Sequence, residues 1–287
     1  MLLTSLLLLL LAVISRTVNG LYAKYALKKV DSFSYFFFVN ILICIAVLPF
    51  IYTSIPSFFT LPALLILALL GAGVIQALSG VMSNYALQSS PVTVYTTLSQ
   101  LQVVWVIVLG VVFLSEEVTL LGSIGVGLIL LASLLVSGSI HIRKETGMRP
   151  IFICILSSVL SALAILVDKV LVDEFDQLFY FFLMLFIPIF FVLPDYMRRS
   201  SFYNEQLKAH FSVYLISALS FGLSYYSLLS LYSLPDVPLS VAYPIRSTSS
   251  IFVAALAIVI FGENKNKVRK LVATVLAVVG AIVVHSA

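Results

Sequence analysis

Ten stretches of apolar residues, separated by short polar segments, run along this chain. A helix needs roughly 20 apolar residues to cross the hydrocarbon core of a bilayer, and each stretch is of about that length. We therefore predict an all-α integral membrane protein with ten transmembrane helices, at residues 2–27, 33–52, 62–88, 91–114, 118–138, 150–172, 177–195, 211–233, 238–261 and 268–285. The longest polar connection, residues 196–210, is too short for a soluble catalytic domain.

The second half of the chain repeats the first. Several residues recur at a distance of 145 or 147 positions: Lys24 as Lys169, Tyr35-Phe36-Phe37 as Tyr180-Phe181-Phe182, Leu48-Pro49 as Leu193-Pro194, Pro91 as Pro238 and Glu116 as Glu263. We predict a first five-helix repeat at residues 1–140 and a second at 148–287. An odd number of spans turns the second copy upside down in the bilayer. Inverted repeats are typical of secondary transporters, whose substrate site lies between the halves near the midplane.

Composition and charge agree with a membrane protein. Hydrophobic residues make up 62% of the chain and charged residues 10%, which excludes a water-soluble globule. The net charge of +4 does not indicate a nucleic-acid partner, because the basic residues gather at helix ends. We expect membrane lipid and a small molecule as partners. Two halves in one chain favour a functional monomer and leave a dimer open.

The basic residues also predict the orientation in the membrane. Cytoplasmic loops carry an excess of Lys and Arg, and the loops after helices one, five, seven and nine hold twelve of the sixteen. These loops are therefore predicted to be cytoplasmic, in a plasma membrane or bacterial inner membrane. The twelve residues are Lys28, Lys29, Arg143, Lys144, Arg149, Arg198, Arg199, Lys208, Lys265, Lys267, Arg269 and Lys270.

The other four basic residues fall within predicted spans, where a charge at the bilayer centre costs about 2.5 to 3.5 kcal/mol. Lys24 and Lys169 lie within a turn of helix ends, so we expect their side chains to reach the headgroups. Arg16 lies about fourteen residues into the first span and requires a wet cavity. Arg246 follows Pro244, which loosens its helix. Both arginines are candidate substrate-binding residues.

Neutral polar residues on the same helices extend this candidate site. Asn19 lies one turn after Arg16, and Tyr243 lies three residues before Arg246, so each pair shares a helical face. Gln76, Gln100 and Tyr225 add further donors and acceptors. The alternative role for each is an interhelical hydrogen bond or an interfacial aromatic anchor.

The organisation resembles a known family. Ten spans in two inverted fives, with Pro91 to Glu116 and Pro238 to Glu263 closing the halves, are similar to the EamA-type ten-helix members of the drug/metabolite transporter superfamily. The resemblance covers essentially the whole chain. It implies alternating access by rocking of helix bundles around a central cavity.

Residues 242–247 carry a more distant likeness, to the tyrosine-containing substrate segment of the small multidrug resistance proteins. In that family an aromatic residue stacks on cations and a membrane glutamate binds protons and cationic drugs. Arg246 and Arg16 stand at those two places here, so features that attract cations are replaced by features that repel them. The family's tyrosine is matched by Tyr243, which implies a packing or substrate role.

The predicted function follows from these arginines. Two guanidinium groups in one low-dielectric cavity seek a carboxylate or phosphate, so we predict a secondary transporter of a small anionic or zwitterionic metabolite. The alternatives are a flippase or scramblase of a phosphorylated lipid headgroup, a non-transporting scaffold or enzyme subunit, and arginines paired with protein groups. We expect no acid near the middle of a span, with Asp168 placed toward an end of helix six, and hence no evident site for proton coupling.

Structural roles and absences complete the prediction. We expect Glu116 and Glu263 to stabilise the start of the helix that follows each of them, and Pro91, Pro238 and Pro244 to act as hinges or helix starts. The sequence has no Walker-type loop and no Gly-x-Ser-x-Gly elbow, and its three histidines stand apart. We therefore predict no enzymatic activity, no cofactor and no metal site.

Overall fold

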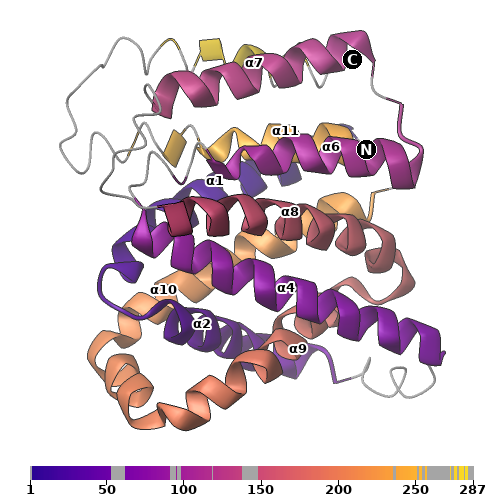
Figure 1. Ribbon diagram of the computed structural model, residues 1–287. Helices are drawn as coiled ribbons and strands as arrows, with labels where there is room; N and C mark the ends of the chain where they lie inside the picture. The colour runs from indigo at the N-terminus through magenta and orange to yellow at the C-terminus, as the bar shows by residue number, and fades with distance from the viewer. Residues whose placement is uncertain are drawn as a thin grey trace.

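The computed structural model describes residues 2–52, 62–90, 95, 98–117, 119–137, 148–234 and 237–250, with isolated residues from 252 to 283. The helices lie alongside one another, stacked from α7 at the top of Figure 1 to α2 and α9 at the bottom. Their bounds are α1 Leu2–Leu27, α2 Ser32–Val47, α4 Ala63–Ser89, α6 Leu101–Leu114, α7 Leu120–Ser137, α8 Met148–Leu171, α9 Gln177–Arg198, α10 Ser200–Tyr232 and α11 Leu239–Ser247.

The described part of the chain is helical throughout and holds no strand, so the all-α prediction is confirmed. Six of its helices are long and apolar enough to cross a membrane. Two more, α6 and α7, are apolar and shorter. Helical residues between 272 and 283 lie where the tenth span is predicted.

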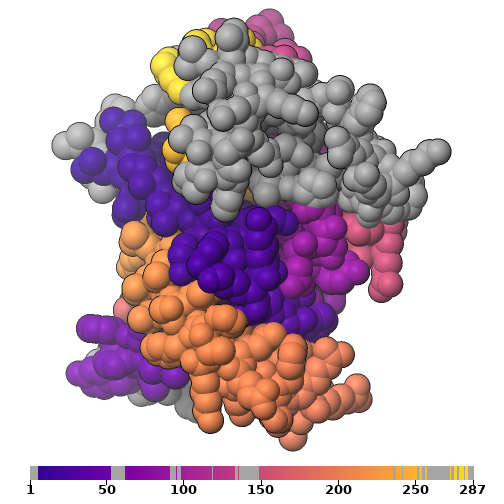
Figure 2. Space-filling view, turned by 90° about the vertical axis from the view of Figure 1, so that its left-hand side faces the viewer, coloured from indigo at the N-terminus to yellow at the C-terminus, as the bar shows by residue number. Residues whose placement is uncertain are grey.

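Helix packing respects the sequence repeat. If α1, α2, α4 and α6 are exchanged for α8, α9, α10 and α11, each major contact maps onto another. The contact of α1 with α10 maps onto that of α8 with α4, and the contact of α4 with α9 maps onto that of α10 with α2. Figure 2 shows α1 in indigo against α10 in orange. Helices therefore pack largely on partners from the other half of the chain.

The same exchange holds at two helix starts. The Asp31 carboxylate accepts hydrogen bonds from the backbone N–H groups of Phe33 and Ser34 at the start of α2. Asp176, 145 residues later, accepts one from Phe179 at the start of α9. Each carboxylate satisfies donors that a helix leaves unpaired in its first turn. These caps fix where the second helix of each half begins.

The predicted long connection at residues 196–210 is wrong, because these residues are helical. The α9 helix runs to Arg198, and α10 starts at Ser200 with a kink at His210, where φ is −131°. Hydropathy could not show this, since the segment is polar although it forms a helix. At the end of α2, residues Leu48–Phe50 form a 3₁₀ turn with Pro49 near its start.

Large apolar side chains cover the outside of the bundle as well as its core. On α1, the exposed residues Leu7, Leu10, Ile14 and Val18 recur at the helical period, and Ile14 is 60% exposed. The opposite side of the same helix holds the buried residues Ala12, Ser15 and Asn19. An apolar stripe facing outward and a polar one facing inward is what a lipid-facing helix around a polar cavity requires.

Candidate functional site

A cavity of about 230 Å³ lies among the helices of both halves. Residues from α1, α2 and α4 form its wall together with residues from α6, α8, α9, α10 and α11. All seven substrate-binding candidates from the sequence line this one space: Arg16, Asn19, Gln76, Gln100, Tyr225, Tyr243 and Arg246. Their positions are consistent with a single site built at the interface of the repeats.

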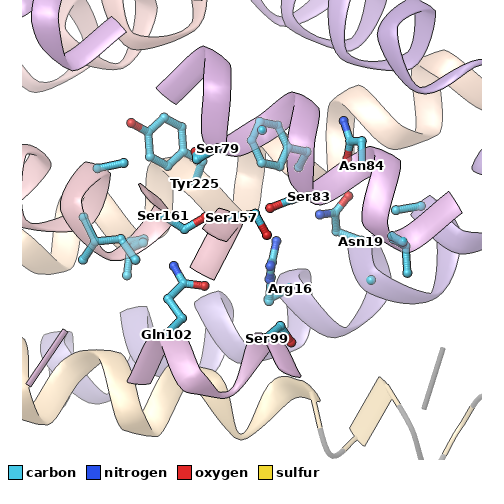
Figure 3. A pocket seen from close by; sticks show the side chains of 18 of the residues that line it. Arg16, Asn19, Ser79, Ser83, Asn84, Ser99, Gln102, Ser157, Ser161 and Tyr225 are labelled. Carbon is cyan, nitrogen blue, oxygen red and sulfur yellow. The ribbon is translucent and has the colours of Figure 1, made fainter. Parts of the chain in front are cut away.

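Arg16 projects from α1 into the cavity. Its side chain points toward the cavity centre in Figure 3, among hydroxyl and amide groups such as Ser157 and Asn19. The residue is half-buried, and within the described chain its guanidinium makes no hydrogen bond or ion pair. A guanidinium carries five N–H donors, so this group is available to an incoming acceptor.

Arg246 reaches the same cavity from α11 and is only 8% exposed. One terminal N–H donates to the hydroxyl of Ser224 at 3.3 Å. The Nε atom is buried and has no partner among the described residues. Burying a charged donor without a partner costs free energy. A hydrogen-bond acceptor bound beside the Arg246 Nε atom would lower that cost.

Asp168 lies toward a helix end, as predicted, but it also forms part of the cavity wall. This residue of α8 is 3% exposed, lines the cavity and accepts hydrogen bonds from Tyr180 and Tyr225. Hydropathy placed it near a helix end because it lies only three residues before Leu171. The packing of α8 against α4, α6 and α10, which the sequence does not reveal, places it in the cavity wall.

The neutral candidates surround these charges. Asn19 is buried and its side-chain oxygen accepts a hydrogen bond from Ser220 at 3.5 Å. Tyr243 is 6% exposed. Gln100 is 4% exposed, and its side-chain oxygen is unpartnered within the described part of the chain. The wall therefore offers an unpaired acceptor at Gln100 as well as the unpaired donor of Arg246.

The three charges break the symmetry of the repeat. Arg16 corresponds to Ser161 and Asp168 to Ala23 at the distance of 145 residues. At 147 residues Arg246 corresponds to Ser99. Scaffold features such as the helix caps occur in both halves. At each of these three pairs of equivalent positions, in contrast, only one of the two halves carries a charged residue. The charged residues are thus additions to a shared scaffold.

The two lysines within predicted spans bind backbone carbonyl oxygens at the ends of neighbouring helices. The Lys24 amino group donates to the carbonyl oxygens of Leu87 at 2.6 Å and Ser90 at 3.0 Å. The Lys169 amino group donates to the carbonyl oxygen of Tyr232 at 2.6 Å. Both satisfy carbonyls that a helix leaves unpaired in its last turn. They are structural groups beside the cavity.

Glu116 caps a different helix from the one predicted. Its two carboxylate oxygens accept hydrogen bonds from the backbone N–H groups of Leu239 at 2.6 Å and Ser240 at 2.8 Å. These N–H groups begin α11 in the other half, directly after Pro238, instead of the helix that follows Glu116. Pro244 lies inside α11. The other two predicted structural residues, Pro91 and Glu263, lie outside the described residues.

Metal chemistry finds no support in the described residues, where no group of three His, Cys, Asp or Glu side chains could hold an ion. The two cysteines, Cys44 and Cys154, are buried and unpaired with each other. With the Arg16 guanidinium, the unpaired Nε of Arg246 and one carboxylate, the cavity can bind and orient a charged solute.

Comparison with known proteins agrees with this architecture. Residues 3–138 and 148–286 each match the model of the EamA-like transporter family. No curated protein matches the sequence. A solved crystal structure superposes with a TM-score of 0.67 at 13% identity, covering 97% of this chain and 95% of the other. The predicted fold, an integral membrane protein of ten helices in two inverted repeats, is confirmed.

Proposed function

Because the chain belongs to the EamA-like transporter family, we propose that it moves a small anionic or zwitterionic metabolite through its central cavity. Arg16 and Arg246 read the negative charge of the cargo, and Asn19, Gln100 and Tyr243 orient it. The observation that supports this most strongly is the buried Arg246 guanidinium, whose Nε has no partner among the described residues. An anion supplies the paired, charge-assisted hydrogen bonds that such a group lacks.

The balance of charge favours an anion over a cation. Among the described residues that line the cavity, three are charged, two arginines and one aspartate. A cation would meet net repulsion, while a carboxylate or phosphate would compensate the excess positive charge in a medium of low dielectric constant. The cavity volume of about 230 Å³ suits a small metabolite.

The packing supports alternating access as the transport mode. Helices of one half contact mainly helices of the other, in pairs that the repeat exchanges. A structure of this kind has two equivalent arrangements, because each set of contacts has a counterpart on the opposite side of the membrane. Rocking of one set of helices against the other would expose the arginines to each side in turn.

Reconstituted vesicles test the proposal with probes of different charge. Four radiolabelled probes are tested separately: glycerol 3-phosphate, L-glutamate, L-leucine and choline. Each is added outside vesicles that contain the same compound without label. We expect exchange of at least one of the first three and none of choline. Arg16→Gln and Arg246→Gln should each lower exchange by about tenfold or more, the loss of one charge-assisted contact, while thermal unfolding stays close to wild type. Exchange of choline alone would contradict the proposal.

A second assay distinguishes movement of lipid headgroups between leaflets from transport of soluble compounds. Vesicles with a fluorescent phosphatidic acid in one leaflet report headgroup movement independently of solute uptake. Lipid movement that depends on Arg246, without exchange of any soluble probe, would replace the metabolite proposal by the flippase alternative.

A further inference from the structure

Asp168 is the one carboxylate among the described residues that line the cavity. Its Oδ1 atom accepts hydrogen bonds from the hydroxyls of Tyr180 at 2.9 Å and Tyr225 at 3.0 Å, and Oδ2 lies 3.0 Å from the same Tyr225 hydroxyl. No basic side chain of the described residues comes within ion-pair distance of it. The adjacent Lys169 is held by the Tyr232 carbonyl. Phenol groups, instead of a cation, therefore solvate this carboxylate.

The arrangement can hold Asp168 in either protonation state without leaving a buried oxygen unsatisfied. When the carboxylate is ionised, both tyrosines donate to it. When Oδ2 carries a proton, it can donate to the Tyr225 oxygen, since a hydroxyl both donates and accepts, while Tyr180 continues to donate to Oδ1. The Tyr225 hydroxyl proton is then released to turn toward the cavity, which this tyrosine also lines.

Protonation changes the net charge of the cavity from one positive charge to two, given Arg16 and Arg246. An anion binds more tightly to the doubly positive state, and a bound anion in turn favours the proton, because the coupling between two ligands is reciprocal. We propose that Asp168 is a proton-binding site that couples proton movement to the movement of an anionic cargo. This inference rests on the proposed function and names its coupling ion.

The cycle balances one proton against one negative charge. A proton from the solvent on the loading side passes through water in the cavity to Asp168 when the anion binds the arginines. The complex then opens to the other side, the anion leaves, and the doubly positive cavity expels the proton to the solvent on that side. When the anion is monovalent, the charges of the bound proton and the bound anion cancel. The loaded site then carries the same net charge across the bilayer as the empty site.

The surroundings of Asp168 define which groups can influence it. Tyr180 faces it from α9, Tyr225 and Tyr232 from α10, and Arg246 from α11. Arg16 from α1, Tyr35 from α2 and Tyr95 beside α6 line the same cavity, while α4 contributes amide and hydroxyl groups. Tyr180 corresponds to Tyr35 across the repeat, yet Asp168 corresponds to Ala23. The first half therefore keeps the tyrosine without the acid, and Asp168 is the one proton site among the described residues of the cavity.

Infrared titration of the purified full-length protein tests the proton site without transport. A protonated carboxyl group absorbs at a carbonyl frequency separate from that of the amide backbone. We expect a carbonyl band that appears on acidification, is absent from Asp168→Asn, moves in frequency in Asp168→Glu, and is unchanged in Asp173→Asn, the control at an exposed acid beside α8. The absence of any carbonyl band that depends on residue 168 would overturn the proposal.

Sulfate tests the coupling between the proton and the anion, because it carries no amine and does not change its protonation state in the pH range in which a carboxyl group titrates. In the wild type we expect sulfate to move the midpoint of the Asp168 band to higher pH by about one unit, equivalent to roughly tenfold coupling. Arg246→Gln and Arg16→Gln should each reduce this shift. The absence of a shift in the wild type would overturn the coupling. A shift in both arginine variants as large as the shift in the wild type would also overturn it.

Vesicle transport separates failure of this inference from failure of the proposed function. An inward proton gradient should drive accumulation of L-glutamate or glycerol 3-phosphate by the wild type. Asp168→Asn should lose this accumulation, and the exposed control Asp173→Asn should keep it. If exchange by the wild type does not depend on the proton gradient, proton coupling is refuted and the proposed transport function still stands. Loss in Asp168→Asn of L-leucine binding alone would instead assign Asp168 to the cargo ammonium group.

Discussion

The Lys24 amino group lies 2.6 Å from the carbonyl oxygen of Leu87. The equivalent pair in the other half, Lys169 and Tyr232, has the same distance of 2.6 Å. The first helix of each half thus holds the last turn of the third. This is a charge-assisted contact between two helices of the same half.

Replacing either lysine by methionine should destabilise the protein, because methionine keeps the apolar stem and removes the donor. We expect Lys24→Met and Lys169→Met each to lower the free energy of unfolding by about 1.5 to 3 kcal/mol, the range for hydrogen bonds to charged groups. Thermal unfolding in detergent measures this. Lys208→Met, at an exposed position of α10, is the control and should leave the unfolding temperature unchanged. Equal behaviour of all three variants would show that the lysine contacts contribute nothing.

Glu116 ties the end of α6 to the start of α11 through two backbone N–H groups. Glu116→Ala should cost about 0.5 to 2 kcal/mol, the range for loss of a helix N-cap, since it leaves those donors unpaired. The neighbouring exposed Glu117 is the matched control. Because the contact joins the two halves, we also expect Glu116→Ala to change the rate of probe exchange in vesicles. An effect of Glu117→Ala as large as that of Glu116→Ala would contradict this role.

Glycine allows the tenth helical segment to approach α7 closely. A Cβ atom at Gly280 would lie 2.8 Å from the carbonyl oxygen of Gly125 and 3.0 Å from Ile129. Gly280→Val should therefore separate the two helices and lower the unfolding temperature. Gly127→Val in α7 is the control, since nothing lies within 4 Å of a Cβ atom there. Membrane helices associate through small residues of this kind. Tolerance of valine at both positions would show that the approach is not needed.

Much of the fold could be predicted from hydropathy and the internal repeat. Apolar runs located the helices, and the repeat indicated the inverted halves. The sequence did not show that residues 200–210 continue as helix, because a polar helix outside the hydrocarbon carries no hydropathy signal. It also did not show which helix Glu116 caps, since the contact joins residues 123 positions apart.

The candidate site was predicted less completely. Arg16 and Arg246 stood out because charge within a span is rare. Asp168 was missed as a cavity residue, since it lies toward the end of a predicted span and the sequence does not show which helices pack there. Alignment of the two halves carries a signal that could have found it. Position 168 holds an acid where the first half holds Ala23, although the tyrosine that donates to it is present in both halves as Tyr180 and Tyr35.

Two glutamines near the cavity should respond in opposite ways to the same substitution. The Gln88 amide donates to the carbonyl oxygens of Leu27 and Val30, both at 3.1 Å, so Gln88→Met removes two hydrogen bonds and should lower the unfolding temperature.

Gln100 is buried with its side-chain oxygen unpartnered among the described residues. Gln100→Met removes that cost, of about 1 to 3 kcal/mol, and should preserve or raise the unfolding temperature. If Gln100 contacts cargo, the same variant lowers the apparent affinity for the exchanged probe. Such a trade of stability against activity is expected where a polar group awaits a ligand, and a fall in stability with unchanged exchange would assign Gln100 to the scaffold.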